Sequence, residues 1–120
     1  MFVERKYKRV SVRVPLFVSL DGDVLLKKMI RIESCDLSGG GLSFETSKKV
    51  PVEANSRVVV AKLGDLSEAA QIEGRVVYRR RDAATGRYAI GLEFIRFINV
   101  TREELVNRIE QWEAQATLPG

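Results

Sequence analysis

The fold class of this chain follows from the stretch VSVRVPLFVSL at residues 10–20. Valine or leucine occupies every second position, and most of the positions between them are polar or charged. Successive side chains of a β-strand point to opposite faces, so this alternation predicts a long strand with one apolar face. Pro15 lies on the other face, which favours an edge position or a bulge. The Asp21-Gly22 pair that follows predicts a hairpin turn.

Five more strands are predicted, over residues 24–38, 42–45, 57–63, 69–80 and 87–97. In the second strand of the chain, parity places Asp36 and Ser38 on one face and Leu37 on the other. In the strand predicted at 69–80, parity places Ile72, Val76 and Tyr78 on the inward face and Gln71, Glu73, Arg75 and Arg79 on the outward face. In the strand predicted at 87–97, the inward residues are Tyr88, Ile90, Leu92 and Phe94, and the outward residues are Arg87 and Glu93.

A helix is predicted from Thr101, which forms a capping box with Glu104. Apolar residues then recur at helical spacing, and residues 118–120 should end the helix. The apolar stripe is expected to cover one end of the sheet structure, with Trp112 in the core; it consists of Leu105, Ile109, Trp112 and Ala116. Six strands followed by one helix predict an all-β chain, a small antiparallel barrel or sandwich.

The composition fits one domain. The chain has 120 residues, of which 45% are hydrophobic. No apolar run approaches the length of a membrane span, and residues 1–9 lack the apolar segment of a signal peptide. We therefore expect a soluble, cytoplasmic protein. Cys35 is the single cysteine, which excludes an intrachain disulfide, and we expect it to be a small core residue.

The chain has no histidine, and this removes the commonest general base and a frequent metal ligand. Ser38 does not lie in a G-x-S-x-G motif. The glycines 39–41 do not open G-x-G-x-x-G, because Phe44 takes the last position. We expect neither an enzyme, nor a metal site, nor a cofactor.

Positive charge gathers in two places on this chain of net charge +4, at residues 5–9 and 79–81. The second cluster is expected to be a solvated hairpin end. The first carries Arg5 and Arg9, whose guanidinium forks match both phosphate and the O6/N7 edge of guanine. Asp36 can accept hydrogen bonds from the opposite edge of guanine. Gly39 to Gly41 are expected to form a turn whose bare backbone also admits a ligand.

The spacing R-x-x-x-R, then a gap from Val10 to Cys35, then D-x-S-x-x-G resembles the PilZ domain family; here it is Arg5, Arg9, Asp36, Ser38 and Gly41. The stretch Gly91 to Phe94 also resembles the last barrel strand of that family. The resemblance implies a six-stranded antiparallel β-barrel with a C-terminal α-helix. It implies a basic ligand-binding arm at residues 1–9 and a barrel with its helix at residues 10–120.

The resemblance also implies a receptor for cyclic di-GMP, a bacterial second messenger. Arg5 and Arg9 would grip guanine and phosphate, and Asp36, Ser38 and Gly41 would hold a guanine edge. The arm would then fold over the ligand and change the surface offered to an effector protein in motility, exopolysaccharide and biofilm formation, or virulence. Candidate accessory positions are Lys6, Tyr7, Lys8, Gly39 and Gly40.

Two details of the expected site follow from single residues. Tyr7 can stack on a base or anchor the arm to the barrel, and the sequence does not decide between them. Glu4 precedes the first arginine, where a basic residue favours a stacked pair of ligands in the family, so we expect one ligand per protomer.

Two alternatives remain open at this point. One is a small nucleic-acid-binding barrel, which basic residues and a β surface allow. Its binding would depend strongly on salt. The other is a PilZ-type protein-interaction module that does not bind the nucleotide.

Overall fold

The computed structural model describes residues 7–19, 29–47 and 54–117, with Thr117 described in backbone only. The predicted turn at Asp21-Gly22, residues 24–28 of the second predicted strand and the helix-ending residues 118–120 lie outside these ranges. So do Glu4, Arg5 and Lys6, and residues 48–53.

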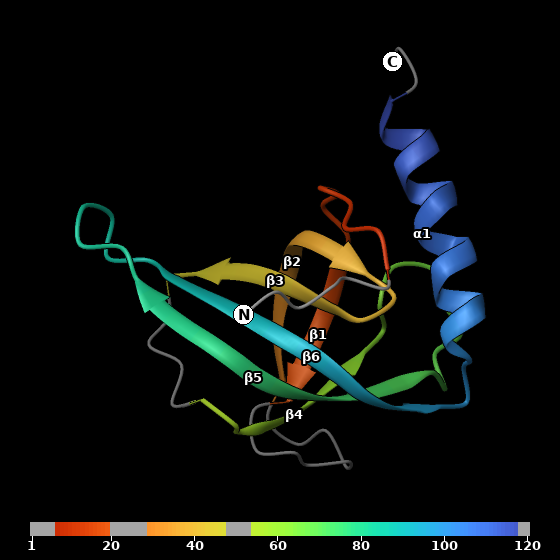
Figure 1. Ribbon diagram of the computed structural model, residues 1–120, viewed down its shortest axis with the longest axis horizontal. Helices are drawn as coiled ribbons and strands as arrows, with labels where there is room; N and C mark the ends of the chain where they lie inside the picture. The colour runs from red at the N-terminus through yellow and green to blue at the C-terminus, as the bar shows by residue number, and fades with distance from the viewer. Residues whose placement is uncertain (1–6, 20–28, 48–53, 118–120) are drawn as a thin grey trace.

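Six antiparallel strands close into a barrel, and one helix follows them (Figure 1). The strands neighbour one another in the order β1-β2-β3-β6-β5-β4, and β1 pairs with β4 to close the ring. The elements are β1 (Pro15–Ser19), β2 (Met29–Ser38), β3 (Gly41–Thr46), β4 (Arg57–Ala61), β5 (Gln71–Arg81), β6 (Tyr88–Ile98) and α1 (Arg102–Thr117). The predicted all-β barrel with a C-terminal helix is confirmed.

The first predicted strand is shorter than its alternation suggests. Val10, Val12 and Val14 are buried as expected, yet the regular strand begins only at Pro15. The buried hydroxyl of Ser34 explains this, because it donates to the carbonyl of Val12 (2.5 Å) and accepts from the N–H of Val14 (3.0 Å). The Ser34 side chain thus takes the place of backbone hydrogen bonds between strands at Val12 and Val14. Pro15, which has no N–H, is the first residue of the regular strand.

A bulge in β2 breaks the parity expected for that strand. Pairing with β3 runs from Ser34 directly to Asp36, so Cys35 is the extra residue. Ser34 is buried before the bulge and Leu37 after it, so the inward face changes from even to odd numbers. Asp36 and Ser38 therefore no longer share a face with Ser34, although they still alternate with Leu37. The bulge also leaves Cys35 half-buried, so the core position expected for it is wrong.

A second bulge, at Val77 in β5, overturns two predicted orientations. Val76 pairs with Leu92, Tyr78 with Gly91 and Arg79 with Ile90. Directly paired residues point to the same face, so Arg79 shares the inner face with the buried Ile90. Tyr78, expected inward, turns to the other face, where its ring lies over the bare backbone of Gly91.

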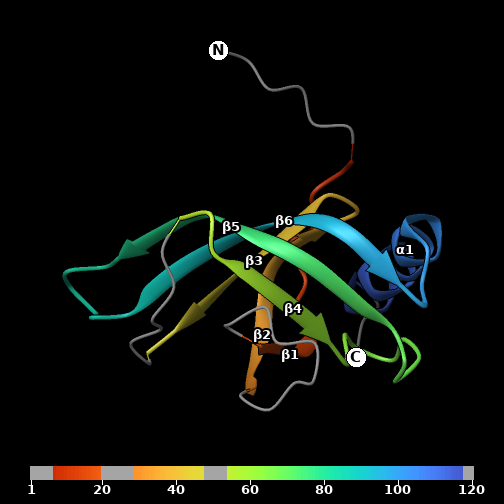
Figure 2. The same cartoon turned by 90° about the horizontal axis from the view of Figure 1, so that it is seen from below.

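The helix begins as predicted. The Oγ1 of Thr101 accepts from the N–H of Glu104 (3.0 Å) and donates to the Glu104 carboxylate (3.2 Å). Leu105, Ile109 and Trp112 are buried in the core, whereas Ala116 is exposed because the helix extends past the barrel (Figure 1). Figure 2 shows that α1 and the tip of the β5–β6 hairpin lie at opposite ends of the molecule.

Candidate functional site

Three of the predicted ligand residues, Arg9, Asp36 and Ser38, lie near one another where the chain enters the barrel, and Arg5 lies outside the described residues. Val10 and Leu37 exchange both backbone hydrogen bonds, each 2.9 Å long. In an antiparallel pair this register sets Arg9 opposite Ser38 and Ser11 opposite Asp36. The second of these pairs is linked directly, because the Ser11 hydroxyl donates to Asp36 Oδ1 (2.9 Å). One short backbone bridge therefore brings the exposed Arg9 beside the D-x-S motif.

Ser38 shapes the turn between β2 and β3. Its hydroxyl accepts from the N–H of Gly40 (3.1 Å) and lies 3.4 Å from the carbonyl of Gly41, to which it donates. The carbonyl of Gly40 in turn accepts from the N–H of Phe94 (2.9 Å). The turn is held by these bonds within itself and to β6.

Packing within the barrel is by itself enough to require a glycine at position 41. A Cβ at this position would overlap the carbonyl oxygen of Leu92 in the neighbouring strand β6. Real Cβ atoms do not approach backbone oxygens so closely, so any side chain here would push two paired strands apart. The glycine in the motif thus has a structural reason besides the ligand contact that the resemblance implies.

Tyr7 packs on the barrel in this structure. Its ring lies against Gly39, where an added Cβ would be 3.0 Å from Cδ1. The guanidinium of Arg102, at the start of α1, lies 5.4 Å from the centre of the Tyr7 ring and 4.9 Å from that of Phe97. Arg102 thus joins the arm, the last strand and the helix. No sequence pattern marks Arg102, because only the fold brings these three segments together.

A pocket of about 430 Å³ lies between the arm and the helix. Its lining is partly apolar and includes two carboxylates; the residues are Tyr7, Lys8, Val10, Gly39, Val106, Ile109, Glu110 and Glu113. Lys8 approaches Glu113 at 3.4 Å. Arg9, Asp36 and Ser38 do not line this pocket. Arg9 is exposed, Asp36 is half-buried and Ser38 is buried.

Cys35 does not have the character of a nucleophile. Partial burial raises the pKa of its thiol above the ordinary value, and the nearby Glu45 carboxylate raises it further, because both disfavour the charged form. The neutral thiol therefore predominates at neutral pH, and the thiolate that would react is scarce. In the ranges that the structure describes, no three acidic, cysteine or histidine side chains are placed to hold a metal ion.

No helix in the described part of the chain has the length and apolar character needed to cross a membrane.

Comparisons with known proteins agree with the geometry. The model of the PilZ domain matches residues 4–111. The Bacillus subtilis inhibitor of motility MotI/DgrA superposes with a TM-score of 0.73 at 12% identity, covering 98% of this chain and 55% of that one. This chain thus spans about half the length of that protein.

The PilZ domain of Escherichia coli YcgR, in a structure with c-di-GMP, gives a TM-score of 0.59 at 18% identity and 95% coverage of both chains. MrkH of K. pneumonia in its apo state gives 0.59 at 15% identity, covering 95% of this chain and 55% of that one. A search of curated proteins found no match. The family match spans most of the sequence, and the barrel has the same fold as these structures, so the chain belongs to the PilZ domain family.

Proposed function

We propose that this protein is a non-catalytic, cytoplasmic receptor for cyclic di-GMP. The observation that carries the proposal is the Val10–Leu37 bridge, which sets Arg9 beside Asp36 and Ser38. The PilZ domain of E. coli YcgR was solved with c-di-GMP, and it shares this fold. Family membership and the adjacency of the motif residues support the same ligand here.

Each motif residue has a chemical task in this proposal. Arg9, with Arg5, offers planar donors to phosphate oxygens and to the O6/N7 edge of guanine. Asp36 accepts from the N1–H and N2 amine of the base, and the Ser11 bond at 2.9 Å holds its carboxylate in position. The turn at residues 38–41 is held by its own hydrogen bonds and by the bond from Phe94, so it offers a rigid floor to the ligand.

The contacts of the arm suggest how binding reaches a partner. Tyr7 lies against Gly39 and beside Arg102 of α1, and Lys8 lies 3.4 Å from Glu113 of the same helix. A ligand that draws Arg9 toward Asp36 would shift Tyr7 and Lys8 and so change their contacts with α1. The surface formed by the arm and α1 then changes and signals to a separate effector protein, in motility, exopolysaccharide and biofilm formation, or virulence.

The test is isothermal titration of the intact protein with cyclic di-GMP, with Arg9→Ala and Asp36→Ala compared with Arg80→Ala. Arg80 provides a matched control, because it loses the same charge on the distant β5–β6 hairpin. We expect Arg9→Ala to cost about 2–4 kcal/mol of binding through lost charge-assisted bonds, and Arg80→Ala to change little. Asp36→Ala should weaken binding even though it removes a negative charge near an anion.

Saturation at one ligand per protomer is expected from Glu4, whose carboxylate would repel the phosphates of a second ligand. Saturation at two would overturn that part of the proposal. Absence of binding by the folded protein would instead favour a protein-interaction module that has kept the motif as structure.

A further inference from the structure

Arg102 lies where neither the helix nor hydrogen bonding favours an arginine. It is the first residue of α1, and a cation at the N-terminus of a helix opposes the helix dipole. Glu103 and Glu104, in the same turn, are acidic, as the dipole prefers. The Nε of Arg102 is buried, and none of the described residues accepts a hydrogen bond from it. The reason for an arginine at this position therefore lies outside the helix.

Two aromatic rings account for the position of Arg102. Its guanidinium carbon lies 4.9 Å from the centre of the Phe97 ring in β6 and 5.4 Å from that of the Tyr7 ring. Both distances are within the range of cation–π contacts. Phe97 packs against the hydrophobic core, so its ring provides a fixed support for the guanidinium. Arg102 thus presents a held cation to the ring of Tyr7.

The Tyr7 ring also contacts the turn that carries the D-x-S-x-x-G motif. A Cβ added to Gly39 in that turn would lie 3.0 Å from Cδ1 of the ring and 2.7 Å from Cγ2 of Val106 in α1. These distances leave no room for a side chain at Gly39. The bare backbone of the turn therefore allows the Tyr7 ring to pack on it and to reach Arg102 at the same time.

These contacts fix the chain on one side of Arg9. On its other side, Val10 exchanges two backbone hydrogen bonds of 2.9 Å with Leu37. Arg9 thus lies between two anchored residues, and its own side chain is exposed beside Ser38. Anchoring the backbone on both sides lowers the conformational entropy that Arg9 would lose on binding an anion.

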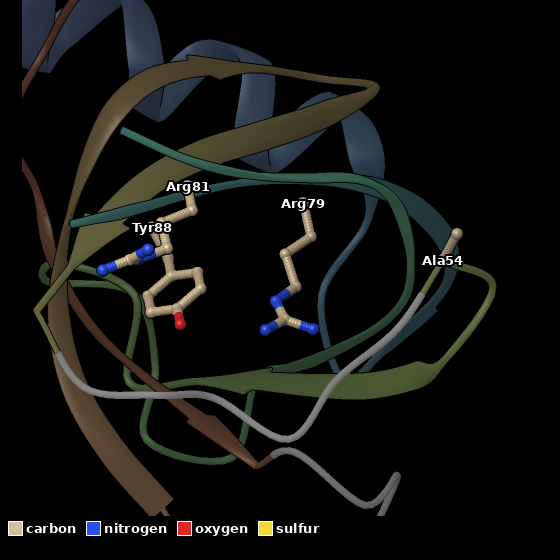
Figure 3. Close-up of a pocket in the computed structure, with 4 residues that line it drawn as sticks. All are labelled: Ala54, Arg79, Arg81 and Tyr88. Atoms are coloured by element: carbon tan, nitrogen blue, oxygen red, sulfur yellow. The ribbon is translucent and has the colours of Figure 1, made fainter. Parts of the chain in front are cut away.

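An arginine–tyrosine stack at the other end of the barrel provides a comparison. The guanidinium carbon of Arg79 lies 4.9 Å from the centre of the Tyr88 ring, and Figure 3 shows both side chains beside the pocket there. Arg79 is exposed, as predicted for a solvated hairpin end, and the tip of this hairpin lies opposite α1 (Figure 2). Arg79→Gln therefore removes the same charge from the same kind of stack, far from Tyr7.

We infer that Arg102 is a positioning residue for the cyclic di-GMP site: its stack on Tyr7 holds the arm so that Arg9 stays beside Asp36 and Ser38. The inference rests on the proposed function for the identity of the ligand, whereas the order of the arm can be measured with no ligand added. Arg102 acts through Tyr7 and does not itself contact the nucleotide.

The first test measures the {¹H}–¹⁵N nuclear Overhauser effect at the amides of Lys8 and Arg9 in the ¹⁵N-labelled full chain. This effect reports backbone motion on the picosecond-to-nanosecond timescale. We expect Arg102→Gln to lower both values and Arg79→Gln to leave them unchanged. Equal values in the parent and in Arg102→Gln would overturn the inference, whether or not the protein binds cyclic di-GMP.

The second test is isothermal titration of the same variants with cyclic di-GMP. Loss of a cation–π contact should weaken binding about three- to tenfold for Arg102→Gln. Arg79→Gln should stay within about twofold, because salt screens a distant charge. Tyr7→Phe keeps the ring and should bind like the parent, whereas Tyr7→Leu should weaken binding. Adding Arg102→Gln to Tyr7→Leu should weaken it no further, because both changes remove the same contact.

Three results of the titration would overturn the inference. Additive weakening by Tyr7→Leu and Arg102→Gln would show that the two residues act separately. Tighter binding by Arg102→Gln would show that the stack holds the arm away from the ligand. Unchanged affinity with a lowered melting temperature would make Arg102 a purely structural residue. If the parent itself does not bind cyclic di-GMP, the proposed function fails, and the arm measurement alone decides whether Arg102 positions the arm.

Discussion

Each end of this barrel has an arginine stacked on a tyrosine, and the surroundings of the two stacks differ. At the helix end, Arg102 lies between Tyr7 and Phe97, and its Nε is buried with no hydrogen-bond partner among the described residues. At the hairpin end, Arg79 stacks on Tyr88 beside a hollow of about 370 Å³. The first arginine acts as packing between segments, whereas the second borders a pocket.

The difference lies in what surrounds each stack. The helix end is sealed by apolar side chains of α1, namely Leu105, Ile109 and Trp112, all of them in the core. The hairpin end has arginines on the inner face beyond Ile90, so that end of the core meets polar groups. We therefore expect truncations at the helix end to lower the stability of the barrel more than truncations at the hairpin end.

The largest expected effect is that of Trp112→Ala. Trp112 is 9% exposed, packs against Gly64 and donates from Nε1 to Asp65 (2.9 Å). Its truncation should lower the free energy of unfolding by about 3–5 kcal/mol through the lost burial and the cavity. Urea denaturation followed by far-ultraviolet circular dichroism measures this, because Trp112 is the single tryptophan and fluorescence would lose its probe.

Tyr88→Ala is the matching truncation of an aromatic side chain at the other end. Tyr88 is only half-buried. Its loss should therefore cost about 1 kcal/mol. Equal losses of stability for Trp112→Ala and Tyr88→Ala would show that the two ends contribute alike to the stability of the barrel.

Gly41→Ala, at the turn beside the arm, should lower the free energy of unfolding by less than Trp112→Ala does. The new Cβ would overlap the backbone oxygen of Leu92. β3 and β6 must then separate, at a cost of about 2–3 kcal/mol. Gly40→Ala is the control, because a Cβ added there would lie 3.4 Å from the Tyr7 ring, an ordinary van der Waals contact. It should change the free energy of unfolding by less than about 1 kcal/mol.

Thermal unfolding and cyclic di-GMP titration of both glycine variants separate the two roles of Gly41. A Gly41→Ala protein as stable as the parent, but unable to bind the nucleotide, would show that the glycine serves the ligand and not the barrel.

The smallest effect is expected for Lys8→Ala. Its contact with Glu113 is 3.4 Å long, and the Lys8 side chain is 78% exposed. Solvent and salt screen such a pair, so it should contribute less than about 0.5 kcal/mol. Glu113→Gln should match it within error in chemical denaturation. A loss above about 1 kcal/mol for either variant would exceed the usual range for an exposed pair, and would show that an ion pair, and not the packing of Tyr7, holds the arm to α1.

Local patterns in the sequence determined much of this fold. The alternation at residues 10–20 predicted the buried valines, and the Thr101–Glu104 pair predicted the start of α1. Both signals depend only on near neighbours along the chain. The motif residues Arg9, Asp36 and Ser38 were also found from spacing. The role of these residues in binding a ligand stays a prediction, as does that of Arg5 and Lys6, which lie outside the described residues.

Only the tertiary structure decided which way several side chains point. One extra residue, at Cys35 in β2 and at Val77 in β5, reverses the inward face of everything that follows in the strand. A bulge depends on how two strands pair, so the alternation of residues along one strand does not reveal it. For the same reason, the sequence identified Arg79, Arg81 and Tyr88 as separate features, and the pairing of β5 with β6 made them one pocket.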